Sequence, residues 1–165
     1  MEESLVANIL KVYQALNRQS VEYLIVGGTA VAFHGYYRMS AMPSGLISDK
    51  HDLDLWYNPT YKNYYNLLNA MDELGINVKL YKEEVEPNPK SSFFSHEFAD
   101  FKIDFLPEII GMTKFALPFS RRVTSNINGI EIHVISLEDL IASKKSSSRQ
   151  KDLEDLTQLK LIHKK

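Results

Sequence analysis

The strongest constraint on the fold lies between residues 21 and 57, where an apolar run stops at two glycines and a later run carries paired aspartates. Residues 21–26, VEYLIV, are rich in β-branched side chains and predict a buried strand. Gly27 and Gly28 end this run, and residues 29–37 have the spacing of apolar groups that is typical of a helix. The unit therefore predicts a strand that passes directly into a helix.

The glycine pair indicates a turn that could bind phosphate. Backbone N–H groups at the start of a helix have no partner within the helix, and they favour a negative charge. Gly27 and Gly28 would let a phosphate approach the backbone closely, and Thr29 adds a hydroxyl. A tight turn without a ligand is the alternative, and for an isolated pair of glycines it is the commoner one.

Two aspartates on the next predicted strand indicate a metal site. Residues 51–57 alternate, so Asp52 and Asp54 project from one face. Like charges held this close repel each other unless a cation neutralises them, and oxygen ligands favour Mg²⁺ or Mn²⁺. The alternative is a solvated strand edge without a metal.

A third carboxylate, Asp104, lies inside the apolar run FKIDFL at residues 101–106. An aspartate in such a strand is rare unless it is paired or bound to a metal. If this strand lies beside that of Asp52, three carboxylates converge in an arrangement suited to metal-assisted phosphoryl or nucleotidyl transfer. Asp104 would then also help to deprotonate the attacking hydroxyl. The alternative is a structural ion pair with Lys102 or an arginine.

Three basic residues could hold a triphosphate near these carboxylates. Arg38 lies late in the predicted helix after the glycine pair and could contact a nucleotide or an acceptor. Lys144 and Lys151 lie in the C-terminal helical segment, where they could neutralise the charge of the leaving group. For any single lysine, a solvated helix face is the alternative.

The remaining pattern predicts an α/β (α+β) fold with one mixed β-sheet flanked by helices and followed by C-terminal helices. We expect a single domain over residues 1–165, with a core at about 21–135 and a helical segment at about 136–163. The additional predicted elements are helices at 3–18, 61–74, 136–145 and 150–162, strands at 76–81 and 92–96, and a hairpin at 121–135. Residues 82–90, KEEVEPNPK, predict a mobile loop that becomes ordered when an acceptor binds.

Composition excludes several classes of protein. The net charge of −2 gives no global electrostatic reason to bind nucleic acid or membranes. The absence of cysteine excludes disulfides, cysteine-based zinc sites and thiol catalysis. The N-terminus lacks the pattern of a signal peptide, and we expect a cytoplasmic protein.

The order of these motifs resembles the nucleotidyltransferase superfamily that includes DNA polymerase β. The resemblance rests on G-G-T-A-x-x-x-H-G-x-x-R at 27–38, D-L-D-L at 52–55 and I-D-F-L at 103–106. The chain is most similar to the minimal bacterial nucleotidyltransferases, which include antibiotic-modifying enzymes and the AbiEii-type toxins of toxin–antitoxin systems. Residues 136–156 resemble the K…K-D helical segment of the toxins.

The resemblance implies a nucleotidyltransferase fold and transfer of a nucleoside monophosphate from NTP to a hydroxyl, with Mg²⁺ or Mn²⁺ as cofactor. The acceptor would be a small molecule, a tRNA end or a protein side chain. The implied metal ligands and catalytic residues are Asp52, Asp54 and Asp104. The implied nucleotide-binding residues are Gly27, Gly28, Thr29, Lys144 and Lys151, to which the residue pattern adds Arg38.

Two departures from the family pattern concern the acceptor. The loop between Arg38 and Asp52 is longer than usual, and the chain lacks room for the C-terminal domain that binds the acceptor in many relatives. We therefore expect the acceptor to bind at a homodimer interface or with a partner protein. The alternatives to an active transferase are an inactive nucleotide-binding or toxin–antitoxin module of the same fold and a metal-dependent phosphohydrolase. The presence of all three carboxylates argues against the inactive module.

Overall fold

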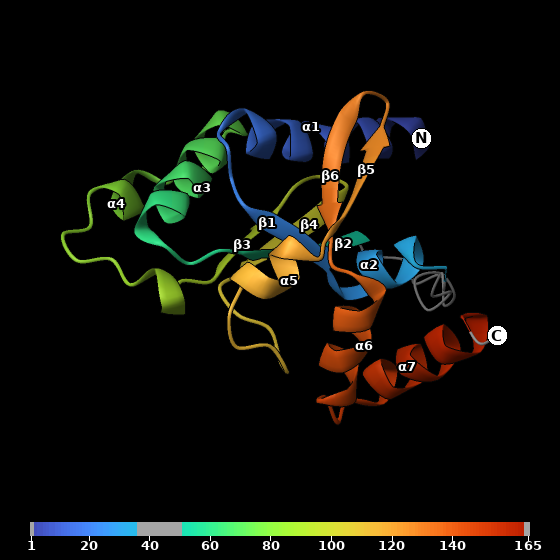
Figure 1. The fold of residues 1–165 in the computed structure, drawn as a ribbon. Coiled ribbons are helices and arrows are strands. Elements are labelled where there is room, and N and C mark those ends of the chain that lie inside the picture. The colour runs from blue at the N-terminus through green and yellow to red at the C-terminus, as the bar shows by residue number, and fades with distance from the viewer. Residues whose placement is uncertain (1, 36–50, 164–165) are drawn as a thin grey trace.

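A mixed six-stranded sheet forms the centre of the molecule in a computed structural model that describes residues 2–35 and 51–163 (Figure 1). The strands follow the order β3-β4-β2-β1-β6-β5 across the sheet. Their bounds are β1 Tyr23–Val26, β2 His51–Tyr57, β3 Phe94–Glu97, β4 Phe101–Leu106, β5 Val123–Ile127 and β6 Ile130–Val134. The predicted α/β architecture with one mixed sheet is confirmed.

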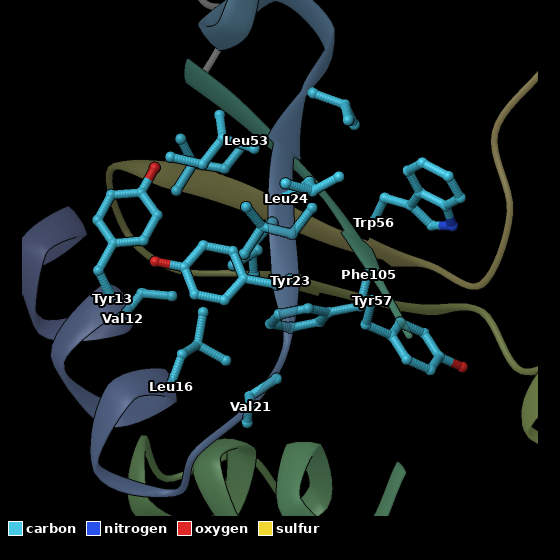
Figure 2. Close-up of a cluster of buried hydrophobic side chains, with 14 of the residues drawn as sticks. Val12, Tyr13, Leu16, Val21, Tyr23, Leu24, Leu53, Trp56, Tyr57 and Phe105 are labelled. Atoms are coloured by element: carbon cyan, nitrogen blue, oxygen red, sulfur yellow. The ribbon is translucent and has the colours of Figure 1, made fainter. Parts of the chain in front are cut away.

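Two helices cover one face of this sheet. They are α1 (Glu2–Arg18) and α3 (Tyr61–Glu73), and both bury an apolar stripe at helical spacing. The Tyr13 ring of α1 stacks on the Tyr23 ring of β1, with ring centroids 6.2 Å apart (Figure 2). The inward side chains of the central strands, such as Leu53 and Phe105, are fully buried against this layer. Because this face is apolar, the polar residues of the same strands must lie on the other face.

The opposite face carries the aspartates and is only partly covered. Trp56 packs edge-on against Phe115, which directly precedes α5 (Ala116–Ser120). Its indole Nε1 donates a hydrogen bond to the carbonyl oxygen of Pro107 at 3.2 Å. The helices α6 (Leu137–Lys145) and α7 (Gln150–Ile162) lie beyond this region, at the lower right of Figure 1. The short helix α2 (Gly27–Phe33) follows β1 without an intervening loop, as predicted.

The register of the strands sets the geometry of the site. β1 pairs antiparallel with β2, β2 pairs parallel with β4, and β3 pairs antiparallel with β4. One row of Cα partners therefore crosses four strands and consists of Val26, Asp54, Asp104 and Ser95. Side chains in one such row project from the same face, so the register brings two carboxylates and a hydroxyl together.

The predicted hairpin and helix cap near the C-terminus are confirmed. Asn128 and Gly129 form the turn between β5 and β6, and both have positive φ angles, 51° and 84°. Ser136 caps α6 by accepting a hydrogen bond from the backbone N–H of Asp139 at 3.1 Å. Serines 146–148 separate α6 from α7.

The predicted strand at 76–81 is wrong. Residues Lys79–Lys82 form a turn of helix, α4, next to α3. The apolar alternation of this segment indicated a strand, but only Ile76 and Val78 are buried, whereas Leu80 is 81% exposed. Burial of two side chains against α3 does not require a strand.

The segment 82–90 is irregular, as predicted, and its end is anchored. It leads into a 3₁₀ turn, η3 (Pro89–Ser91), and both prolines of the segment are buried. The Tyr57 hydroxyl donates to the carbonyl oxygens of Pro89, at 3.0 Å, and Ser92, at 2.5 Å. The mobility of residues 82–90 stays a prediction.

None of the described helices is long and apolar enough to cross a membrane.

Candidate functional site

Two of the three predicted carboxylates lie directly opposite each other. Asp54 of β2 and Asp104 of β4 are Cα partners, and Asp52 lies opposite Lys102 one step along the same face. Asp52 is exposed, whereas Asp54 and Asp104 are partly buried. The predicted convergence of the β2 and β4 aspartates on one face is therefore present.

The environment of Asp54 disfavours its charged form. Burial raises the pKa of this carboxyl, and the negative charges of Asp104 and Asp52 raise it further. The positive charges of Lys151 and Lys102 oppose this rise without cancelling it. A carboxylate held in this way gains most from a cation placed beside it.

The backbone of the glycine turn lies against the same carboxylate. Gly27 has a φ of +67°, and a Cβ atom at this position would lie 2.4 Å from Oδ2 of Asp54. Only glycine avoids both the backbone strain and this contact. The hydroxyl of Thr29 donates to the backbone carbonyl oxygen of Asp52 at 3.4 Å, which links α2 to the start of β2. The turn and the aspartates thus form one contiguous site.

Asp104 has two polar neighbours on its own side of the sheet. The Ser95 hydroxyl of β3 donates to Oδ1 of Asp104 at 2.6 Å. The Lys102 ammonium lies 4.0 Å from the same oxygen. The sequence analysis missed Ser95, although the alternation of residues 94–97 would have placed it on the polar face once the pairing of β3 with β4 was known.

In the part of the chain that the structure describes, no three His, Asp or Glu side chains are arranged so that they could hold a metal ion together. The chemistry of the donors nevertheless fits a hard divalent cation, because Asp52, Asp54 and Asp104 offer carboxylate oxygens on one face of adjacent strands. Without a cation, such carboxylates repel one another, and a bound ion would draw them together.

A cleft of about 360 Å³ opens beside Asp54 and reaches the C-terminal helices. Gly27 and Asp54 line it together with Ser148 and Arg149 from the connection between α6 and α7. The apolar side chains of its lining are Val26, Leu106, Ile109, Ile110, Ile135 and Leu140. A second hollow lies between α1 and β6, and none of the three carboxylates lines it.

Lys144 lines this cleft, but its charge is already compensated. Its Nζ lies 2.6 Å from Oδ1 of Asp152 and 3.1 Å from Oδ2 of Asp155, and all three residues are buried. Asp152 also accepts from the Ser147 hydroxyl at 2.6 Å and pairs with Nε of Arg149 at 3.0 Å. Burial alone would raise the pKa of Asp152, but the Lys144 and Ser147 hydrogen bonds and the neighbouring positive charges lower it overall. The group fixes the connection between α6 and α7 at the mouth of the cleft.

Of the other two basic residues predicted for nucleotide binding, Lys151 is within the described residues. Lys151 is exposed on α7, near enough to Asp54 for its charge to lower the pKa of that carboxyl. Arg38 lies outside the described residues.

Comparisons with known proteins identify the family and agree with the fold. The sequence profile of a family described as "Nucleotidyltransferase of unknown function (DUF6036)" matches residues 4–164. Among solved structures, the fold is similar to that of the antibiotic-resistance factor ANT(2'')-Ia, with a TM-score of 0.54 and 19% sequence identity. The similarity covers 98% of this chain and 85% of that one, and at this identity it supports the fold alone. No curated protein is significantly similar in sequence.

Proposed function

Because this chain belongs to the DUF6036 family of nucleotidyltransferases, we propose that it transfers a nucleoside monophosphate from an NTP to a hydroxyl acceptor, with Mg²⁺ or Mn²⁺ held by Asp52, Asp54 and Asp104. One observation carries the proposal, namely that Asp54 and Asp104 are direct partners across two parallel strands while Asp52 shares their face. The raised pKa of Asp54 supports it, because a site that disfavours its own negative charge has unused affinity for a cation.

The residues of the site have separate proposed roles. Asp52 and Asp54 hold the metal against the phosphates, and Asp104 binds metal and accepts the proton of the attacking hydroxyl. The bound metal would supply charge neutralisation and orientation of the triphosphate. Gly27 borders Asp54 and Thr29 donates to the backbone of Asp52, and we propose that the turn formed by Gly27, Gly28 and Thr29 contacts a phosphate on the same ion.

The cationic side chains of the C-terminal helices would act on the opposite side of the nucleotide. Lys151 already acts electrostatically on Asp54, and it is free to contact the triphosphate because it is exposed. Lys144 would contribute through the buried ion-pair group that holds the cleft in shape, and directly only if a phosphate replaced one of its aspartate partners. Arg38 remains a proposed nucleotide contact.

A thermal-shift panel of ATP, GTP, CTP and UTP, each with and without Mg²⁺, tests the proposal. We expect a metal-dependent rise in melting temperature with at least one NTP, because a ligand that binds only the folded state stabilises it. Asp52→Asn should abolish this rise, whereas Asp72→Asn on α3, remote from the site, should keep it. A flat panel for the wild-type chain would contradict an active site in the isolated chain.

A second measurement separates transfer from hydrolysis. The chain is incubated with Mg²⁺ and the stabilising NTP, and free phosphate and pyrophosphate are quantified. Release of pyrophosphate on addition of small hydroxyl compounds, tRNA or a partner protein supports transfer and identifies the acceptor class. Release of free phosphate without any acceptor would instead support a phosphohydrolase.

A further inference from the structure

We propose that Ser95 is a site of self-nucleotidylation, at which the chain transfers a nucleoside monophosphate to its own hydroxyl. The inference rests on the proposed function, since it uses the same metal and NTP site. It adds a protein hydroxyl of this chain as an acceptor.

The contacts of Ser95 are those of a nucleophile beside a base. Its hydroxyl donates to Oδ1 of Asp104 at 2.6 Å, which is within the range required for proton transfer from a nucleophile to a base. Lys102 lies two residues before Asp104 on β4, and its ammonium is 4.0 Å from the same carboxylate oxygen, so its positive charge favours this side for the carboxylate. A nucleophile, a base and a third group that orients the base form the usual signature of an activated hydroxyl.

The register places this hydroxyl on the correct side for in-line displacement. Val26, Asp54, Asp104 and Ser95 form one row, and adjacent strands lie about 4.8 Å apart. The glycine turn follows Val26 at one end of the row, and Ser95 lies at the other. A triphosphate that extends from the glycine turn over the aspartates would therefore have its leaving group on the β1 side and its attacking oxygen on the β3 side.

Ser95 is also accessible to a bound nucleotide. β3 is an outer strand of the sheet, and Ser95 is exposed on it. The Thr29 hydroxyl, by contrast, is directed to a backbone oxygen of Asp52, and the Ser147 hydroxyl is buried on Asp152. Of these three hydroxyls, Ser95 alone combines exposure with a bond to the proposed base.

The reaction balances with NTP as the only co-reactant. Asp104 accepts the proton of the Ser95 hydroxyl, and Oγ forms a bond to the α-phosphorus. The bond between the α-phosphorus and the oxygen that bridges to the β-phosphorus breaks, and pyrophosphate leaves. The proton then passes from Asp104 to water, and Ser95 carries a nucleoside 5′-monophosphate as a phosphodiester. Because the modified side chain stands beside Asp104, it would block the approach of any other acceptor, and the modification would limit the activity of the chain.

Mass spectrometry tests the proposal directly. The full chain is incubated with Mg²⁺ and each NTP, and its intact mass is measured before digestion with trypsin. We expect one nucleoside monophosphate per chain, located by fragmentation on Ser95 within the peptide 91–102. Ser95→Ala should lose the adduct and Ser95→Thr should retain it, while Ser91→Ala, a matched change on the same peptide, should not affect it.

Two further measurements keep the inference separate from the proposed function. A tagged Asp54→Asn chain mixed with wild-type chain should remain unmodified, because the transfer occurs within one chain. Metal-dependent stabilisation by NTP should persist in Ser95→Ala, which also shows that this variant is folded. Stabilisation of the wild-type chain by NTP and Mg²⁺ without an adduct, or with an adduct on another residue, would overturn the inference and leave the proposed function standing. If the wild-type chain shows neither stabilisation nor an adduct, the inference and the proposed function are both overturned.

Discussion

At the scale of single residues, the Asp54 carboxylate lowers the stability of the folded chain in the absence of a cation. Its carboxyl is partly buried beside two other aspartates, and these surroundings raise its pKa, so the ionised form costs folding free energy. A cation would remove that cost, whereas a structural aspartate would have an ion-pair partner instead. The raised pKa therefore supports the proposed metal site over a structural ion pair.

We predict that Asp54→Asn stabilises the metal-free chain by about 1 kcal/mol near pH 8, since it removes a charge that the folded state disfavours. The sign follows from the raised pKa of the folded state, because the unfavourable contribution is present above that pKa and disappears below the pKa of the unfolded chain. The advantage of the variant should therefore shrink as the pH falls toward about 4. Urea unfolding of the variant and the wild-type chain in EDTA, near pH 8 and near pH 4, measures this difference in stability.

The control for this prediction is Asp72→Asn, an exposed aspartate that pairs with Lys82. It should change stability little at either pH. A destabilised Asp54→Asn chain at pH 8 would mean that the carboxylate makes a net favourable contact, and the metal-site assignment would lose its electrostatic support.

Gly27 is constrained both by its positive φ angle and by its contact with Asp54. We predict that Gly27→Ala destabilises the chain by more than the roughly 1 kcal/mol expected for alanine at a positive φ, because the added methyl group also displaces the Asp54 carboxylate. Gly75→Ala is the matched control, since Gly75 has a φ of +86° and open space around its Cβ position. The difference between the two variants in the loss of unfolding free energy, measured with denaturant, gives the cost of the contact with Asp54. Equal costs, together with unchanged stabilisation by NTP and Mg²⁺, would contradict the proposed link between the turn and the site.

At the scale of elements, the connection between α6 and α7 depends on one buried cation. Lys144 faces Asp152 and Asp155, so its removal takes away the buried cation that both carboxylates share, and Asp152 keeps only its ion pair with the exposed Arg149 and its bond to Ser147. We predict that Lys144→Met costs about 3–5 kcal/mol in urea unfolding, because a broken buried ion pair is far more costly than a missing surface one. Its exposed neighbour gives the control, and Lys145→Met should cost little. A stable Lys144→Met chain that fails to bind NTP would show that this lysine serves the nucleotide rather than the fold.

Several elements were predictable from the sequence alone, but their pairing in the sheet was not. The strands of Asp54 and Asp104 were predictable because alternation and burial have a clear period, and the hairpin and the Ser136 cap were predictable from turn and cap chemistry. The pairing of strands was not, since register depends on contacts between residues that lie far apart in the sequence. Ser95 was therefore missed, although it bonds to a residue that was identified. The helical turn at Lys79–Lys82 was mistaken for a strand because two buried apolar residues suit either structure.

At the scale of the whole molecule, the cleft connects parts of the chain that are distant in sequence. The α2 end of the site and the end of α7 are joined by His163, whose Nε2 donates to the carbonyl oxygen of His34 at 2.7 Å. His34 in turn donates from Nε2 to the carbonyl oxygen of Ile135, between β6 and α6, at 2.8 Å. The C-terminal helices are thus held at both ends, by these bonds at one end and by the Lys144 ion pairs at the other. A nucleotide that fills the cleft would contact the sheet and the helices at once.

This arrangement predicts a pattern of hydrogen exchange. On addition of Mg²⁺ and the stabilising NTP, amides of α2 and amides of residues 146–149 should both exchange at least tenfold more slowly, because one ligand closes the opening motions on both sides of the cleft. Amides of α3, on the opposite face of the sheet, should not change. Asp52→Asn serves as the control. In this variant neither α2 nor residues 146–149 should gain protection, and the exchange rates of the α3 amides should equal those of the wild-type chain. If protection appeared on α2 alone, the nucleotide would lie on the aspartates without reaching the C-terminal helices, and the proposed phosphate contact of Lys151 would have to be withdrawn.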